Sequence, residues 1–176
     1  LAEADAPGEV LFRAVNACIL FAPMLDGRAL FTVESLGREG ALHPVQQAMV
    51  DTHASQCGFC TPGFVMSLYA HQRQGAATDE QTLKDALAGN LCRCTGYGPI
   101  LAGRAMGEDP QAAEVRALHA ALVAIRPTED LVLEHKGRLF FAPRTDDAFA
   151  EIIEKNPDAV IVAGATDVGL WVTKQG

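Results

Sequence analysis

The fold of this chain is decided by two short stretches, Gln56-Cys57-Gly58-Phe59-Cys60 and Asn90-Leu91-Cys92-Arg93-Cys94-Thr95-Gly96. Each stretch carries a pair of cysteines, with two residues between the first pair and one between the second. Thirty-one residues lie between the two pairs, and each pair adjoins the expected end of a helix. A small helical bundle can bring two such loops together at one pole. The four cysteines therefore predict a shared metal site.

Four converging thiolates can hold either zinc or a [2Fe–2S] cluster. Zinc sites favour cysteine pairs two to four residues apart, because both sulfurs must reach one ion. A [2Fe–2S] cluster has two irons, so each pair can chelate its own iron. The tight spacing of Cys92 and Cys94 is unusual for zinc. Gly58 and Gly96 leave room for backbone N–H groups to approach the sulfurs, and Arg93 adds positive charge; both effects raise a cluster's reduction potential.

Two alternative roles for the cysteines fit the sequence less well. Buried structural cysteines would pack as small hydrophobic side chains, but glycine and proline around both pairs favour a ligand role. A thioredoxin-like redox pair at Cys57 and Cys60 would need to open a helix after a strand in a βαβ unit, and that context is absent. A zinc-stapled helical module without enzymatic activity stays as the alternative to an iron–sulfur domain.

The composition excludes several classes of protein. Hydrophobic residues make up 49% and charged residues 20% of the 176 residues, which excludes a disordered tail or a fibre. A net charge of -8 without a basic run argues against nucleic-acid binding. No apolar stretch reaches the ~20 residues that span a bilayer, and no signal peptide is visible. Five cysteines without an export signal indicate a reducing, cytoplasmic compartment rather than a disulfide framework.

Four helices joined by short loops are expected between residues 42 and 107. The first begins at Pro44 and ends near Ala54, and the second begins at Thr61-Pro62 with Thr61 as candidate N-cap. A third begins with a capping box at Thr78 and ends at Gly89, and Pro99 begins a fourth. The second helix has an apolar face that consists of Phe64, Val65, Leu68 and Tyr69.

Two short apolar segments precede these helices. Val10–Val15 and Ala29–Glu34 are compatible with β-strands, and Asp26-Gly27 between them is a turn signal. Cys18 follows the first segment. Without further context, a lone cysteine on an apolar stretch is most often a buried core residue.

The pattern changes after the expected bundle. Pro110–Ile125 is an alanine-rich helical run, and Leu131–Ala142 contains Lys136-Gly137 at the turn of an expected hairpin. Thr145 can cap a helix that ends at Lys155, and Val160–Ala163 is an expected strand. Strand, helix, strand and loop predict the beginning of an α/β domain. The histidines have no catalytic partner at useful spacing, and carboxylates such as Asp109 are expected on solvated faces or at caps.

The cysteine motifs closely resemble the iron–sulfur domain of the molybdenum hydroxylases. The resemblance rests on Cys57–Gly63 and Gly89–Tyr97, is supported by Leu42–Met49, and covers about Val15–Met106. Within that family, the chain is most similar to the small, iron–sulfur subunit of the bacterial xanthine dehydrogenases. The resemblance implies that one [2Fe–2S] cluster, the one nearer the molybdenum cofactor, is ligated by Cys57, Cys60, Cys92 and Cys94.

The resemblance implies two further cofactor contacts. Gln56 would touch the pterin of the molybdenum cofactor, which a partner chain carries. Val15-Asn16-Ala17-Cys18 resembles the fourth-ligand segment of a plant-type ferredoxin domain, so Cys18 would ligate a second [2Fe–2S] cluster. Its other three ligands come from a C-x4-C-x2-C loop, which would lie before Leu1. We therefore expect this chain alone not to hold the second cluster.

The end of the sequence resembles the first flavin-binding loop of the FAD domain in the same family. Such a loop can present backbone N–H groups to a pyrophosphate, although a simple β–turn–α connection explains most bare patterns of this kind. The family motif has Gly or Asn where this chain has Ala165, which disfavours tight pyrophosphate contact. The residues of the expected FAD loop are Ile161, Val162, Ala163, Gly164, Ala165, Thr166, Asp167 and Val168.

The expected fold class is α+β, in four regions. Residues 1–40 would be a remnant of a plant-type ferredoxin β-grasp domain, and residues 41–110 a four-helix [2Fe–2S]-binding bundle. Residues 111–130 would form a helix and linker, and residues 131–176 the beginning of an α/β FAD-binding domain.

The resemblance also implies a function. Substrate is oxidised at molybdenum on a large partner subunit, and electrons pass through two [2Fe–2S] clusters to FAD and then to NAD. In the xanthine dehydrogenase type the substrates are hypoxanthine and xanthine. We expect no substrate-transforming residue here, a heteromer that dimerises further, and no nucleic-acid or membrane partner. Flavin sequence on the same chain favours the xanthine type over related hydroxylases of aldehydes, carbon monoxide or N-heterocycles, which stay as alternatives.

Overall fold

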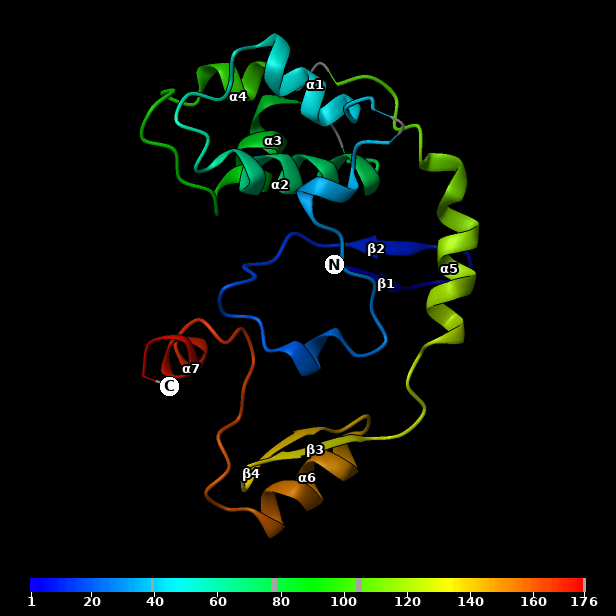
Figure 1. The fold of residues 1–176 in the computed structure, drawn as a ribbon. Helices are drawn as coiled ribbons and strands as arrows, with labels where there is room; N and C mark the ends of the chain where they lie inside the picture. The colour runs from blue at the N-terminus through cyan, green and yellow to red at the C-terminus, as the bar shows by residue number, and fades with distance from the viewer. Residues whose placement is uncertain (39, 77–78, 104–105, 176) are drawn as a thin grey trace. The chain divides into compact units, whose positions relative to one another are not determined.

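The chain forms two compact units in a computed structural model that describes residues 1–38, 40–76, 79–103 and 106–175 (Figure 1). The first unit comprises Leu1–Ala14 and Ala29–Val123, and the second comprises Val15–Arg28 and Ala124–Gly176. Both units mix helices with a two-stranded antiparallel sheet. Among the described residues, no helix combines the length and the apolar character needed to cross a membrane. The four predicted regions stay a prediction.

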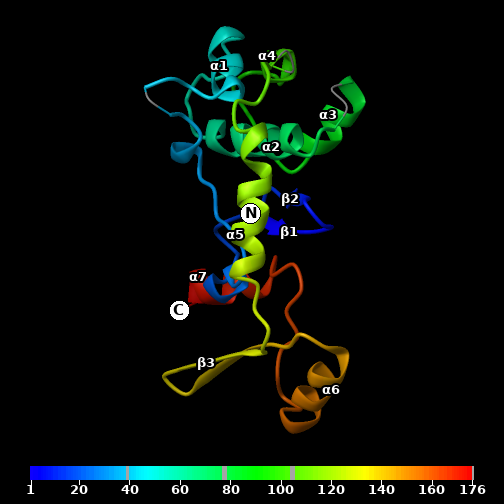
Figure 2. The ribbon, with the colours of Figure 1, turned by 90° about the vertical axis from the view of Figure 1, so that its right-hand side faces the viewer.

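Four helices of the first unit lie where the sequence predicts them. They are α1 (Pro44–Asp51), α2 (Thr61–Arg73), α3 (Glu80–Leu87) and α4 (Gly98–Ala102). In Figures 1 and 2, α1 and α4 lie on one side of this group and α2 and α3 on the other. Pro44 occupies the first turn of α1, where a missing N–H leaves no hydrogen bond unmade.

The core of the first unit is built around α2, which packs against α1 and α3. The predicted apolar face of this helix is buried throughout: Phe64, Val65, Leu68 and Tyr69 are each at most 2% exposed. Side chains from neighbouring elements complete this core, including Phe12, Leu36, Val45, Met49, Leu83, Ile100 and Leu122.

The N-cap predicted for the second helix is wrong. Thr61 is the first residue of α2 rather than its N-cap, and its Oγ1 lies 2.8 Å from Ser55 Oγ instead of accepting a backbone N–H of the helix. Cys60 is the N-cap and makes no side-chain capping bond. Thr78, the predicted start of the third helix, lies outside the described residues. The N-cap of α3 is Asp79, whose carboxylate accepts from two backbone N–H groups of the first turn.

The N-terminal segment forms a hairpin of β1 (Ala2–Ala4) and β2 (Val10–Phe12). The strand predicted over Ala29–Glu34 is wrong: Ala29 makes one isolated bridge to Ala2, and a 3₁₀ turn follows at Val33–Ser35. Ser35 Oγ donates to Thr32 O at 2.7 Å and accepts from Thr32 N–H at 3.3 Å. These local bonds compete with a strand ladder.

The alanine-rich run after the bundle begins with a 3₁₀ turn, Ala112–Glu114, and continues as α5 (Val115–Ala124). Its Leu122 is buried in the core of the first unit. The helix thus occupies most of the predicted range.

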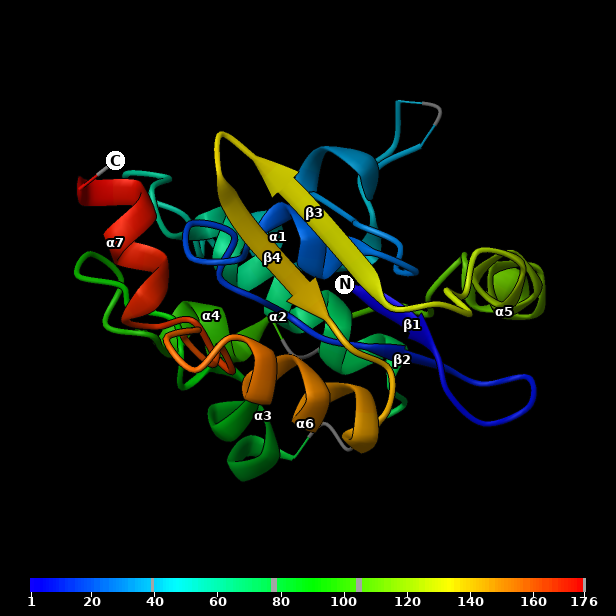
Figure 3. The same cartoon turned by 90° about the horizontal axis from the view of Figure 1, so that it is seen from below.

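The second unit contains a hairpin of β3 (Leu131–His135) and β4 (Arg138–Ala142), followed by α6 (Asp146–Lys155) and α7 (Val168–Gln175) (Figure 3). Lys136 and Gly137 connect the strands with φ of 51° and 74°, as a two-residue hairpin turn requires. Thr145 caps α6, its Oγ1 accepting from Ala148 N–H at 3.1 Å. The predicted hairpin and this cap are confirmed.

The strand predicted over Val160–Ala163 is wrong. The segment is irregular, and neither hairpin strand pairs with it among the described residues. Val160 and Ile161 are 56% and 64% exposed. An apolar run becomes a strand only when a neighbour accepts its backbone hydrogen bonds. On α7, Trp171 is half-exposed.

Candidate metal centre

The two cysteine loops of the first unit meet at the N-terminal ends of α2 and α4. Cys57 and Cys94, one from each loop, place their Sγ atoms 3.5 Å apart. Two sulfurs that each lie about 2.3 Å from one tetrahedral metal ion are separated by about 3.8 Å. The spacing of this pair therefore already suits binding to a single metal.

The other two cysteines form a second contact between the loops. Cys60 and Cys92 also influence each other across the loops, because each shifts the pKa of the other. The sulfur–sulfur contact of Cys57 and Cys94 thus runs across the loops, whereas the sequence spacing indicated that each local pair could chelate its own iron. Within the described ranges, no group of three or more His, Cys, Asp or Glu side chains is arranged to hold one metal ion. Two pairs of thiolates are the donor set of a two-iron cluster.

The two pairs differ in exposure. Cys57 and Cys94 are both exposed, Cys60 is half-buried, and Cys92 is buried at 8% exposure. One pair thus faces solvent, and the other faces the core of the bundle.

Hydrogen bonds around the sulfurs shift the pKa values of the thiols. The Thr95 hydroxyl, then the Thr95 N–H and then the Cys94 N–H lower the pKa of Cys92 to about 7. The Phe59 N–H and then the Cys94 side chain lower the pKa of Cys57. Burial, followed by the contact with Cys92, raises the pKa of Cys60. The loops therefore stabilise the thiolates of Cys57 and Cys92, the form in which cysteine binds metals, whereas the pKa of Cys94 is raised, chiefly by its contact with Cys57.

Glycines shape both loops. Gly58 and Gly96 have φ of 84° and 68°, which L-residues with a side chain rarely adopt. A Cβ on Gly63 would lie only 2.8 Å from Asn90 Oδ1. Its absence lets Asn90 reach Ser67 on α2, where Asn90 Nδ2 donates to Ser67 Oγ at 2.8 Å. This contact ties the second cysteine loop to the helix that begins at the first.

Sequence reasoning gave no role to Thr95 and Tyr97. Thr95 Oγ1 lies 3.2 Å from Cys92 Sγ, and the Thr95 N–H donates to the same sulfur at 3.5 Å. Tyr97 OH accepts from Cys92 N–H at 3.0 Å, and its ring meets Phe64 edge-on at 6.2 Å. The string Cys94-Thr95-Gly96-Tyr97 was the available signal, because a hydroxyl directly after a cysteine pair can reach a sulfur.

The remaining predicted site residues are exposed or belong to the second unit. Gln56 is exposed and directly precedes Cys57. Cys18 is exposed and belongs to the second unit, whereas the other four cysteines belong to the first. The expected FAD loop leads into α7, and its Ala165 is buried with a φ of 57°. Ala165 thus holds the left-handed conformation that Gly or Asn adopts at lower cost.

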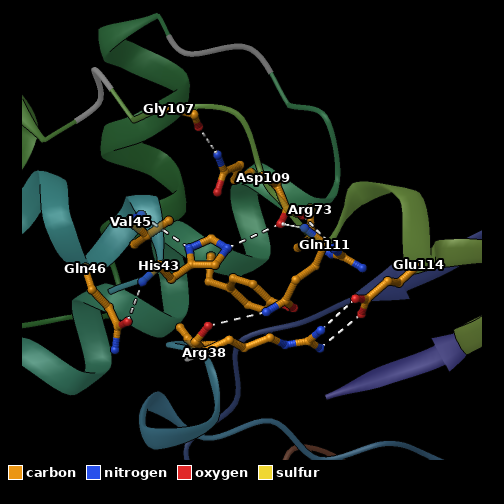
Figure 4. Close-up of polar contacts among 12 residues, drawn as sticks. Arg38, His43, Val45, Gln46, Arg73, Gly107, Asp109, Gln111 and Glu114 are labelled. Atoms are coloured by element: carbon orange, nitrogen blue, oxygen red, sulfur yellow. Dashed lines mark hydrogen bonds and ion pairs between the residues drawn. The ribbon is translucent and has the colours of Figure 1, made fainter. Parts of the chain in front are cut away.

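A second polar cluster lies inside the first unit (Figure 4). Asp109 Oδ2 is 2.5 Å from an Arg73 guanidinium nitrogen, and Asp109 Oδ1 is 3.3 Å from His43 Nε2. Their side chains are 8%, 3% and 0% exposed, respectively. Val45 N–H donates to His43 Nδ1, so Nε2 donates to Asp109. The expectation of a solvated Asp109 is wrong, because the segment after α4 folds back over the bundle.

This cluster fastens residues 107–114 to the helices. Tyr69 OH donates to Gln111 Oε1 at 3.1 Å, and Glu114 makes a two-point ion pair with Arg38 at 2.6 and 3.0 Å. Burial works to raise the pKa of Asp109, but hydrogen bonds from Arg73 and from the Gln111 N–H, together with the Arg73 charge, outweigh it. The pKa of Asp109 therefore lies below its ordinary value.

Comparisons with known proteins agree with the cysteine geometry. Residues 32–104 match the family model described as a [2Fe-2S] binding domain. A xanthine dehydrogenase of Oryza sativa subsp. japonica is 53% identical over 50% of this chain and 7% of its own length. Aldehyde oxidase 1 of Cavia porcellus is 35% identical over 89% of this chain and 15% of its own length.

One solved structure with similarity to the chain is the quinoline 2-oxidoreductase of Pseudomonas putida 86. It is 34% identical with a TM-score of 0.40, over 49% of this chain and 52% of that one. The chain spans 7% and 15% of the xanthine dehydrogenase and the aldehyde oxidase, respectively.

Proposed function

We propose that this chain, whose [2Fe–2S] domain is homologous to those of xanthine dehydrogenases and aldehyde oxidases, carries electrons between a molybdenum cofactor on a partner and FAD. The observation that carries the proposal is the pairing of four thiols from two loops at one pole of the bundle. No other described cysteines or histidines make a comparable set.

The chain's own residues suit this role. Cys57 and Cys94 would hold one iron, because their sulfurs are in contact across the loops, and Cys60 and Cys92 would hold the other. A bound [2Fe–2S] cluster supplies one-electron transfer at a potential set by its surroundings. The backbone N–H groups of both loops stabilise the thiolate charge on either side.

The exposed pair of cysteines indicates the side of the site on which a partner would bind. Cys57 and Cys94 face solvent, and Gln56 beside them is also exposed. A partner-borne molybdenum cofactor would approach on this side, with Gln56 as a hydrogen-bonding contact to its pterin. Cys60 and Cys92 would face the bundle, which keeps water from that half of the site.

The finer assignment is to the xanthine dehydrogenase type, with purines as substrates and NAD as the final acceptor. The flavin-loop sequence on the same chain supports it. Cys18 would ligate a second [2Fe–2S] cluster together with cysteines supplied by a C-x4-C-x2-C loop. A large molybdenum-binding subunit would be the partner. An aldehyde oxidase type is the second candidate, because the Cavia porcellus enzyme matches 89% of the chain.

The experiment is to count iron and acid-labile sulfide in the 176-residue chain, prepared anaerobically, and to record EPR after reduction with dithionite. We expect about two irons and one rhombic signal. A Cys92→Ser variant should lose this signal, and the matched Cys18→Ser variant should keep it. Zinc without iron in the anaerobic protein would refute the electron-transfer function.

A second measurement separates the two candidate enzymes. The chain is assembled with its molybdenum-binding partner, and bleaching of the cluster's visible absorption is followed after addition of xanthine or of an aromatic aldehyde. Bleaching by xanthine supports the purine type. Bleaching by the aldehyde but not by xanthine would instead support the aldehyde oxidase type.

A further inference from the structure

Two contacts of the Thr95 hydroxyl fix the direction in which its hydrogen points. Its Oγ1 accepts a hydrogen bond from Tyr97 N–H at 3.1 Å and lies 3.2 Å from Cys92 Sγ. A metal-bound Cys92 is a thiolate and can only accept. The single hydroxyl hydrogen of Thr95 therefore points to the sulfur, and the Thr95 side chain becomes a donor to Cys92.

The surroundings of Cys92 make this hydrogen bond stronger than a hydrogen bond at the surface. Cys92 is 8% exposed, and hydrogen bonds strengthen where the local dielectric is low. Cys92 Sγ also receives the Thr95 N–H at 3.5 Å. Cys57, in contrast, is exposed, so water weakens the bonds it receives. Stabilisation of sulfur charge is therefore strongest at Cys92.

Tyr97 holds this arrangement in place. It has a φ of 67°, which is unfavourable for a residue with a side chain. Its N–H binds Thr95 Oγ1, its OH accepts from Cys92 N–H, and its ring packs against Phe64. The Thr95 and Tyr97 hydroxyls therefore both contact Cys92 from one strained backbone turn. The packing of the Tyr97 ring on Phe64 helps to hold this turn in place.

We propose that Thr95 is a positioning residue whose hydroxyl raises the reduction potential of the site by stabilising the thiolate of Cys92. The proposal rests on the proposed function, because it needs a cluster on these cysteines. One electron, supplied by the partner's molybdenum cofactor or by dithionite in the test, enters the site and increases the negative charge on its ligands. A hydroxyl hydrogen directed at Cys92 Sγ offsets that charge, and no bond is made or broken.

The test uses three variants of the 176-residue chain, each loaded anaerobically and titrated potentiometrically with EPR detection. Thr95→Val keeps the shape of the side chain and removes the donor. We expect its midpoint to fall by an amount equal to an about tenfold loss in the equilibrium constant of one-electron reduction, about 59 mV. Thr95→Ser, which keeps the hydroxyl, should titrate close to the wild type.

Thr61→Val is the matched control. Its hydroxyl also lies next to a ligand cysteine in sequence, but Thr61 Oγ1 contacts Ser55 Oγ rather than a sulfur. We expect its midpoint to equal that of the wild type. A fall in the control as large as in Thr95→Val would mean that any lost hydroxyl near the loops has the same effect, and would overturn the inference.

The remaining outcomes are also decisive. A Thr95→Val protein that holds two irons and titrates at the wild-type midpoint overturns the inference and leaves the proposed function intact. If Thr95→Val does not hold iron, Thr95→Ala replaces it, since it lacks both the hydroxyl and the branching methyl group. Loss of iron from both the Thr95→Val and the Thr95→Ala variant would overturn the inference, because the hydroxyl would then be needed to maintain the loop rather than to tune the potential. Loss of iron from the wild type would instead refute the proposed function.

Discussion

The two units of the chain differ in how much apolar surface they bury. The first unit buries large side chains such as Phe64, Leu68 and Leu83, whereas Ala165 is the buried apolar residue in the described part of the second. The second unit instead exposes Val132, Leu133, Leu139, Phe149, Val160, Ile161, Leu170, Trp171 and Val172. Secondary structure therefore has two sources here: packing around α2 in the first unit, and turn and cap signals in the second.

The largest expected effect comes from removing a core side chain of the first unit. Phe64 is fully buried on α2 and supports the Tyr97 ring. Phe64→Ala should lower the free energy of unfolding by about 3–5 kcal/mol, because it leaves a cavity. Phe149→Ala, at a half-exposed position of the second unit, should cost less than about 1 kcal/mol. Denaturant unfolding monitored by circular dichroism compares the two, and equal losses would contradict the contrast.

The next effect comes from the buried ion pair of the first unit. Asp109→Asn leaves the Arg73 charge buried at 3% side-chain exposure without its counter-ion. We expect a loss of about 3 kcal/mol in the free energy of unfolding. The control is Glu114→Gln, which breaks the exposed ion pair to Arg38 and should cost less than about 1 kcal/mol. An Asp109→Asn protein as stable as this control would show that the buried pair contributes no net stability.

The same carboxylate predicts a pH dependence. The folded pKa of Asp109 lies below its unfolded value, so the unfolded state binds the proton more readily. The stabilisation is complete above the unfolded pKa and is lost as pH falls through the folded pKa. Thermal unfolding of the wild type and of Asp109→Asn, measured from neutral pH into the acid range, should show their stability difference shrinking as pH falls. A constant difference would assign the loss to a cause other than ionisation.

The smallest effect compares matched helix caps. Asp79 caps α3 in the first unit and Thr145 caps α6 in the second. Replacing either with alanine should cost about 1 kcal/mol. In Asp79→Ala the loss should leave α3 folded, because Leu83 and Leu87 remain buried, whereas in Thr145→Ala α6 should fray, since no residue of α6 is buried. Native-state hydrogen exchange of the two helices measures this, and unchanged protection of α6 would contradict it.

Elements with a local cause could be predicted from the sequence. Pro44 begins α1, Lys136-Gly137 turns the β3–β4 hairpin, and Thr145 caps α6. Each needs only its immediate neighbours, so a short window of sequence contains the whole physical reason. The apolar face of α2 was also visible, because its spacing of three and four residues is itself a local pattern.

Features that depend on distant residues could not be predicted. Val160–Ala163 is apolar enough for a strand but has no described strand to pair with. Asp109 is buried only because Arg73 and His43, more than thirty residues away in sequence, receive it. The same limit applies at the cysteines. Their spacing predicted one site, but their cross-loop contacts follow from how α2 and α4 are placed. The ligands themselves stay a prediction.

The position of the single tryptophan has a spectroscopic consequence. Trp171 lies on α7 in the second unit, whereas both tyrosines of the chain, Tyr69 and Tyr97, lie in the first. Emission excited selectively at tryptophan therefore comes from a residue of the second unit, and the tyrosine bands come from residues of the bundle. Since Tyr97 OH accepts the Cys92 N–H, its near-ultraviolet band also reports on the turn beside the thiols. The two chromophores let unfolding of each unit be followed in one sample without any added label.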